Sequence, residues 1–125
     1  MFTEPEPKCI LDDDASVRHS IVELLDSDGL KAQSFKEVES FFAYVGCHPV
    51  NLALLDVWMA ETSGLEVQAW LHLVSPGTKM IVMTARETPA IRAAALGGGA
   101  CAFVVKPFDD GEFLFLVRQA LRSPA

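Results

Sequence analysis

The sequence has 125 residues, of which half are hydrophobic and 22% are charged, so it can form one domain around a buried core. Its net charge of -7 argues against contact with nucleic acid or with an anionic membrane surface, and no apolar run approaches the roughly 18 residues of a membrane span. Cys9, Cys47 and Cys101 are too few and too dispersed for a disulfide framework, and we expect small buried residues in a reducing cytoplasm.

The first half of the chain alternates between strand-like and helix-like segments. Residues 1–7 indicate an N-terminal tail, and the apolar run at 9–11 is typical of a short strand. Apolar residues at helical spacing predict a helix over 14–28, which the sequence SDG ends. A strand of weaker alternation follows at 30–35, and helical spacing returns over 38–45 before GCHP ends it.

The second half repeats this alternation. Residues 51–55 form a continuous apolar run, which indicates a buried strand, and 67–74 have the spacing of a helix that SPG ends. Residues 79–84 predict a strand, 89–96 a helix closed by three glycines, and 101–105 a fifth strand.

The last predicted element is a helix that contains Phe113, Val117 and Leu121 and can take Asp109 as its N-cap. Five strands alternating with five helices predict an α/β fold with a parallel sheet. The strands are continuous apolar runs, as expected when helices cover both faces of the sheet. We expect one domain over residues 8–122 and a short tail at 123–125.

Polar side chains follow four of the five predicted strands. The run Asp12–Asp14 follows the first strand, Asp56 the third and Lys106 the fifth, and the fourth strand ends in Thr84. In parallel α/β sheets, ligands bind outside the carboxyl ends of the strands, where the strand order reverses. We therefore expect carboxylates, a hydroxyl and an ammonium group to gather at one edge of the sheet.

This set of side chains suits phosphoryl chemistry. Asp12, Asp13 and Asp56 cannot all be ionised at close range without a counter-charge, and Mg²⁺, which prefers oxygen ligands, can supply it. An ionised aspartate can then act as a nucleophile toward phosphorus. Lys106 and Thr84 can stabilise the charge on the phosphoryl oxygens.

Each of these residues also has an ordinary structural interpretation. An aspartate before a helix is usually an N-cap, which accounts for Asp14 or Asp13 but not for three in a row. Asp56 can be a turn residue, Thr84 the polar end of a strand and Lys106 a solvated surface residue. Their coincidence at the ends of the strands favours the functional interpretation.

Four motifs resemble the receiver domains of bacterial two-component response regulators: ILDDDASVR, LALLDVWMAETSGLEV, MIVMTAR and FVVKPF, in this order and spacing. The resemblance covers roughly residues 8–122 and implies a flavodoxin-like, doubly wound sheet with strand order 2-1-3-4-5. ILDDDASVR and SGLEV are most similar to receivers attached to helix-turn-helix transcription factors.

The resemblance implies a role for each acidic residue. Asp13 is expected to bind Mg²⁺ directly and Asp12 largely through water. Asp56 is implied to be both the phosphoacceptor and a metal ligand, and Trp58 to offer its backbone carbonyl to the metal. Asp14 falls at a variable position of the family and is expected to cap the first helix.

The resemblance also implies the remaining parts of a switch. Thr84 corresponds to the switch hydroxyl, and the backbone N–H of Ala85 is expected to contact the phosphoryl group. Lys106 corresponds to the phosphate-binding lysine, and the bond from Lys106 to Pro107 is expected to be cis. Phe103 takes the place of the aromatic residue whose rotamer reports activation.

The chain departs from the family after the phosphoacceptor. Residues 59–61 read Met-Ala-Glu where the family usually has Met-Pro-Gly, which loosens the loop after Asp56, and we expect the added carboxylate of Glu61 to point to solvent. Trp58 is large for its position and, with Arg86, flanks the place where a hydrolytic water would approach. We therefore predict a slow loss of the phosphoryl group.

The function that the resemblance implies is a cytoplasmic signalling switch. A sensor histidine kinase or phosphotransfer protein would donate the phosphoryl group, and an output domain or partner, such as one for transcription, would respond. The chain would catalyse only its own phosphorylation and slow dephosphorylation, so we do not expect an enzyme. The signal would leave through the fourth helix, fifth strand and fifth helix, where Phe115 and Leu116 indicate a homodimer surface.

Two other functions stay open at this point. The changed loop at Ala60 and Glu61 is compatible with a binding module that keeps the receiver fold without being phosphorylated. A hydrolase of the haloacid-dehalogenase type would use Asp12 in an Asp-x-Asp motif, but it would leave Asp56 without a role and usually needs a longer chain.

Overall fold

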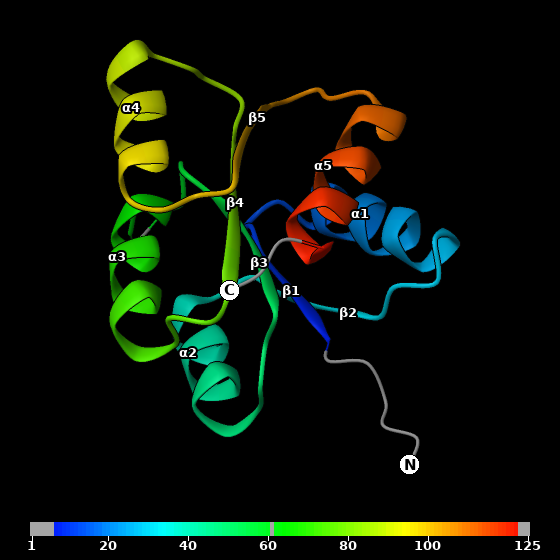
Figure 1. Cartoon of the computed structure of the whole chain (residues 1–125), viewed down its shortest axis with the longest axis horizontal. Coiled ribbons are helices and arrows are strands. Elements are labelled where there is room, and N and C mark those ends of the chain that lie inside the picture. The colour runs from blue at the N-terminus through cyan, green and yellow to red at the C-terminus, as the bar shows by residue number, and fades with distance from the viewer. Residues whose placement is uncertain (1–6, 61, 123–125) are drawn as a thin grey trace.

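The computed structural model describes residues 7–60 and 62–122 and contains one five-stranded sheet between two layers of helices (Figure 1). The strands follow the order β2-β1-β3-β4-β5, and every neighbouring pair is parallel. Their bounds are β1 Lys8–Leu11, β2 Ala32–Phe35, β3 Leu52–Asp56, β4 Lys79–Thr84 and β5 Ala102–Val105. This confirms the predicted doubly wound α/β fold. The tails predicted at 1–7 and 123–125 lie outside the described residues, except for Pro7, and so does Glu61.

Five helices cover the sheet, with α1 and α5 on one face and α2, α3 and α4 on the other (Figure 1). Their bounds are α1 Ala15–Ser27, α2 Val38–Cys47, α3 Gly64–Val74, α4 Pro89–Gly97 and α5 Asp110–Arg122. Asp109 accepts a hydrogen bond from the Glu112 backbone N–H at 2.9 Å, as expected of a residue that caps α5. Among the described residues, none of these helices has the length and apolar character required to cross a membrane.

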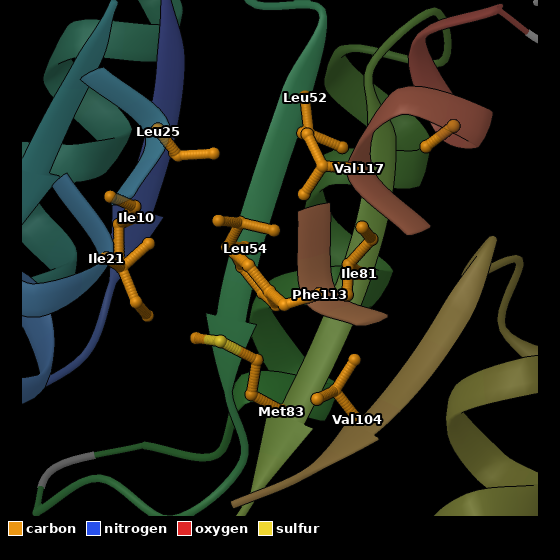
Figure 2. Close-up of a cluster of buried hydrophobic side chains, with 11 residues drawn as sticks. Ile10, Ile21, Leu25, Leu52, Leu54, Ile81, Met83, Val104, Phe113 and Val117 are labelled. Carbon is orange, nitrogen blue, oxygen red and sulfur yellow. The ribbon is translucent and has the colours of Figure 1, made fainter. Parts of the chain in front are cut away.

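The inner strands have alternating residues on the two faces of the sheet, as the pleat of a strand requires. Ile10, Leu54 and Ile81 pack on the side of α1 and α5, where they meet Ile21 and Phe113 (Figure 2). The opposite face packs against α2 and α3 through the other set of strand residues: Cys9, Leu11, Ala53, Leu55 and Met80. Burial on both faces explains why these strands are continuous apolar runs in the sequence.

The second strand begins later than predicted. The expected strand at 30–35 starts at Ala32, because the chain is still completing the turn after α1. Gly29 adopts a φ of 75°, which favours glycine, and the Leu30 N–H donates to the Leu25 carbonyl at 2.9 Å.

The prediction that all three cysteines are buried is wrong for two of them. Cys9 lies in β1 and is fully buried, but Cys47 and Cys101 are exposed. Cys47 is the last residue of α2, and Cys101 directly precedes β5, the strand at one edge of the sheet. Ends of helices and edge strands have fewer covering neighbours than the central strands, and an apolar residue type alone does not reveal this.

Candidate functional site

Three carboxylates meet at the carboxyl edge of the sheet. β1 and β3 are paired with Leu11 opposite Leu55, so Asp12 and Asp56 follow as neighbours. Together with Asp13, each offers a carboxylate oxygen, and these oxygens all lie within 4.8 Å of one another. Asp12 is 1% exposed and Asp56 5%, whereas Asp13 is half-buried.

Lys106 reaches this cluster from the end of β5. Its Nζ donates to Asp12 Oδ2 at 2.6 Å and to Asp56 Oδ1 at 3.0 Å. Its backbone N–H donates to the Thr84 carbonyl at 2.8 Å, and the bond from Lys106 to Pro107 is cis, as the resemblance implies. Lys106 is therefore an ion-paired residue of the site and not a solvated surface lysine.

The charges of the cluster shift two pKa values. Burial, followed by repulsion from Asp12, raises the pKa of Asp56 to about 6 even though Lys106 acts in the opposite direction. Burial alone would lower the pKa of Lys106, but hydrogen bonds and attraction from Asp12 and Asp56 outweigh it and raise the pKa of the ammonium group. Three carboxylates facing one ammonium group form a donor set whose chemistry fits a hard divalent cation.

The third aspartate of the run has a different task. The carboxylate of Asp14 accepts from the Ser16 N–H at 2.9 Å and from the Val17 N–H at 3.3 Å, so it is the N-cap of α1. Hydrogen bonding by the Ser16 side chain, then by these backbone groups, lowers the pKa of Asp14. The Asp14 N–H itself donates to Asp12 Oδ1 at 3.0 Å, which fixes the orientation of the buried carboxylate.

The loop after β3 also contacts the acidic run. The Ala60 N–H donates to Asp13 Oδ2 at 3.2 Å, which connects two loops that are 47 residues apart in the sequence. A residue other than proline at position 60 is required for this hydrogen bond, because proline has no N–H. The departure of the Met-Ala-Glu sequence from the family therefore provides a donor to Asp13.

Thr84 ends β4 beside this cluster and is fully buried. Its hydroxyl donates to the Arg86 carbonyl at 3.0 Å and accepts from the Arg86 N–H at 3.1 Å. Ala85 is exposed between them. In this structure the Thr84 hydroxyl is thus hydrogen-bonded within the loop that follows β4.

Trp58 and Arg86 are in contact across the edge of the site. The indole Nε1 donates to the Arg86 carbonyl at 3.3 Å, and the Arg86 Cζ lies 5.0 Å from the centre of the indole ring. Phe103 lies further along the sheet, half-buried on β5, where it packs with Val82 and Ile91. The structure therefore joins Trp58 to the loop after β4 and places Phe103 outside the carboxylate cluster.

Comparison with known proteins identifies the family. A family model for the response regulator receiver domain matches residues 9–118. The chain belongs to this family. All the site residues predicted from the sequence, from Asp12 to Pro107, lie within the matched range of the receiver domain.

Individual relatives of this receiver domain agree with the assignment. The chain is 33% identical over 114 residues to the regulatory protein VirG of Rhizobium rhizogenes, an alignment that covers 91% of this chain and 47% of VirG. The chain thus spans about half the length of this curated relative.

Solved structures share the receiver fold at lower identity. A CheY-like receiver domain protein from Methanospirillum hungatei JF-1 is 24% identical, with a TM-score of 0.89 and 94% of each chain covered. The beryllofluoride-activated NtrC4 receiver domain dimer, also 24% identical, has a TM-score of 0.88 and covers 92% of this chain and 95% of its own.

Gly64 is a residue of the receiver site that the sequence analysis did not single out. A Cβ atom at this position would lie 2.1 Å from the carbonyl oxygen of Asp56, so only glycine fits. The preceding Ser63 caps α3 by accepting from the Leu65 N–H at 3.1 Å. A serine and a glycine before an apolar helical pattern are the signal that could have indicated this close approach.

Proposed function

We propose that this receiver domain is a phosphorylation-dependent signalling switch that accepts a phosphoryl group on Asp56. The observation that carries the proposal is the position of Asp56, whose carboxylate lies between two further carboxylates and the ammonium group of Lys106. An acceptor needs an ionised oxygen, and it also needs positive charge nearby for the incoming phosphoryl oxygens.

The proposed reaction is a direct displacement at phosphorus. A carboxylate oxygen of Asp56 attacks the phosphorus of a phosphohistidine, the new O–P bond forms as the P–N bond breaks, and the electron pair remains on the imidazole nitrogen of the donor. A Mg²⁺ ion held by Asp12, Asp13, Asp56 and the Trp58 carbonyl would supply positive charge to the phosphoryl oxygens.

The remaining groups of the site would stabilise the product. The ammonium group of Lys106 already lies 3.0 Å from Asp56 Oδ1 and can pair with a phosphoryl oxygen. The Thr84 hydroxyl and the Ala85 N–H can donate to the other two phosphoryl oxygens once the loop after β4 moves toward the phosphoryl group. This movement is the local event through which a charge change at Asp56 reaches α4 and β5.

The proposed partners follow from the family. A sensor histidine kinase or phosphotransfer protein would be the donor, in the cytoplasm, and a transcription domain or another partner would receive the signal. The chain would promote its own phosphorylation and slow dephosphorylation without turning over other substrates. A homodimer through α4, β5 and α5 is part of this proposal.

The hydrolase alternative is disfavoured by the hydrogen bonds of Asp12. Both its carboxylate oxygens accept hydrogen bonds, Oδ2 from Lys106 and Oδ1 from the Asp14 N–H, which opposes a role of Asp12 as the nucleophile. The contacts of the site are equally compatible with a binding module that is not phosphorylated. The phosphorylation experiment distinguishes this alternative from the switch.

The test is the intact mass of the protein after incubation with Mg²⁺ and acetyl phosphate. We expect the wild type to gain one phosphoryl group, about 80 Da for the acyl phosphate formed by nucleophilic attack, and Asp56→Asn to gain none. Asp26→Asn, a change of an exposed carboxylate on α1, is the matched control and should gain the group. No gain in any protein would support the binding module, and a gain in Asp56→Asn would place the acceptor elsewhere.

A further inference from the structure

The backbone carbonyl of Arg86 accepts hydrogen bonds from two side chains. The Thr84 hydroxyl donates to it at 3.0 Å, and the Trp58 indole N–H donates to it at 3.3 Å. A carbonyl oxygen has two lone pairs and can accept both. One peptide group therefore connects the switch hydroxyl of the fourth strand with the loop that follows Asp56.

Trp58 also connects Arg86 to a distant part of the fold. Among the described residues, the hydrogen bonds, ion pairs and ring contacts of Arg86 beyond its own segment are the indole hydrogen bond and the guanidinium group above the indole ring, 5.0 Å from its centre. The other contacts are with Thr84, two residues earlier. The position of the Arg86 peptide thus depends on a side chain 28 residues away.

The two hydrogen bonds between Thr84 and Arg86 close a small ring that uses the only donor proton of the hydroxyl. The hydroxyl gives its single proton to the Arg86 carbonyl and accepts from the Arg86 N–H. To donate to a phosphoryl group on Asp56, this hydroxyl must leave the Arg86 carbonyl. Any contact that keeps the Arg86 peptide in its present place stabilises the state before phosphorylation.

We infer that Trp58 is a positioning residue that holds Thr84 in its resting orientation through the backbone of Arg86. The inference rests on the proposed function, because it concerns the hydroxyl that would engage the phosphoryl group. A contact made in only one of two states shifts the equilibrium toward that state. Trp58 therefore opposes activation, and this role is separate from any effect on the approach of water.

The first test measures the equilibrium affinity for beryllofluoride, a phosphoryl mimic, in the presence of Mg²⁺ by calorimetry. Trp58→Phe keeps an aromatic ring beneath Arg86 but removes the indole donor. We expect its Kd to fall by about 2- to 10-fold, the range that one net hydrogen bond corresponds to. Trp70→Phe is the matched control, since Trp70 stacks on Phe42 between α2 and α3, and its Kd should equal that of the wild type.

A double-mutant cycle tests whether the effect passes through Thr84. Thr84→Val removes the hydroxyl and should weaken binding by itself. In that background Trp58→Phe should change the Kd by less than about 1.5-fold, because no hydroxyl is left to hold. An equal effect in both backgrounds would overturn the inference, and so would weaker binding by Trp58→Phe alone.

A second measurement needs neither metal nor beryllofluoride. The Arg86 amide donates to Thr84 Oγ1, so its hydrogen exchange reports whether the ring between these residues is closed. We expect Trp58→Phe to accelerate this exchange at least about threefold in the metal-free protein, with the amides of β4 unchanged. Failure of the wild type to bind beryllofluoride would overturn the proposed function, whereas unchanged exchange and affinity in Trp58→Phe would overturn this inference alone.

Discussion

At the scale of single residues, the site has charges that oppose folding. Asp12, Asp13 and Asp56 present oxygens within 4.8 Å of one another, and Lys106 neutralises only part of this charge. The raised pKa of Asp56 reflects this excess of negative charge and its burial, because the ionised carboxylate is less favourable in the folded than in the unfolded chain. Added positive charge would stabilise this arrangement, as the proposed phosphoryl acceptor requires.

The variant Asp56→Asn should therefore be more stable than the wild type in the absence of metal. The pKa of Asp56 rises from 3.8 to about 6, so native Asp56 keeps its proton to higher pH and the wild type loses stability as pH rises from about 4 to about 6. We expect Asp56→Asn to raise the free energy of unfolding by about 1–2 kcal/mol at pH 7. The pKa shift alone would give more, at roughly 1.4 kcal/mol per pKa unit. The gain is smaller because the substitution also weakens the hydrogen bond from Lys106.

Urea unfolding in EDTA at several pH values measures this gain. The difference between Asp56→Asn and the wild type should be near zero below about pH 4 and reach its full size above about pH 6, as the sign of the linkage requires. Asp26→Asn, an exposed control on α1, should show no such dependence. A variant that is less stable than the wild type at pH 7 would contradict the charge argument.

The second prediction at this scale concerns the lifetime of the phosphoryl group. Trp58 is 46% exposed and lies against Arg86. We expect the two side chains to flank the approach of water to Asp56. Replacing the indole by the small amide of Trp58→Asn should admit water and speed the loss of phosphate several-fold. Release of inorganic phosphate from phosphorylated protein, after removal of the donor, measures the rate, and equal rates would refute the prediction.

At the scale of elements, the start of α3 is fitted against the end of β3. The Gly64 N–H donates to the Val57 carbonyl at 3.0 Å, and the Cα of Gly64 is so near the Asp56 carbonyl that a Cβ has no space. The helix thereby supports the strand end that presents Asp56, the proposed acceptor. The position of Asp56 depends on a glycine in the following helix as well as on β3 itself.

We predict that Gly64→Ala destabilises the fold and impairs phosphorylation together. The added methyl group would lie 2.1 Å from a backbone oxygen, which cannot move as a flexible side chain can, and overpacking of this kind costs about 1–3 kcal/mol or more. Gly46→Ala in α2 is the matched control, because its Cβ has no neighbour within 4 Å and alanine favours helix by about 1 kcal/mol. Thermal unfolding and the acetyl phosphate assay of both variants provide the comparison, and equal behaviour would disprove the steric argument.

The elements that could be predicted from the sequence are those with a strong local pattern. β1, β3 and β4 are largely continuous apolar runs, and their ends predict that Asp56, Thr84 and the acidic run lie at one edge of the sheet. β2 was predicted too early, because its half-buried residues give a weak pattern and the turn after α1 extends through Leu30.

The contacts between elements could not be predicted in the same way. The hydrogen bond from Trp58 to Arg86 and that from Ala60 to Asp13 join loops 28 and 47 residues apart. Their geometry follows from how strands, turns and helices are packed, and single-sequence periodicity contains no information about it. The close approach of Gly64 to Asp56 is a feature of the same kind.

At the scale of the whole molecule, apolar side chains remain exposed on the surface formed by α4, β5 and α5. Phe115 of α5 is 56% exposed, and Leu96 of α4 and Val105 of β5 are exposed as well. The Thr84 carbonyl accepts a hydrogen bond from the Lys106 N–H, next to the end of β5, so the proposed movement of Thr84 would reach this surface through one hydrogen bond. In the proposed switch, a conformational change at Asp56 would therefore have a short path to the surface through which we propose that two copies of the chain associate.

We predict that activation promotes dimerisation through this surface. With Mg²⁺ and beryllofluoride, sedimentation equilibrium should show an increase from monomer to dimer mass in the wild type, and Phe115→Ser should lower the association constant at least about tenfold, since an exposed aromatic at an interface centre is a frequent hot spot. Leu73→Ser is the matched control, because Leu73 is 80% exposed on α3, away from α5. Dimerisation that Leu73→Ser abolishes and Phe115→Ser leaves intact would place the interface on α3, and a monomer under all conditions would mean that the exposed apolar residues serve a different partner.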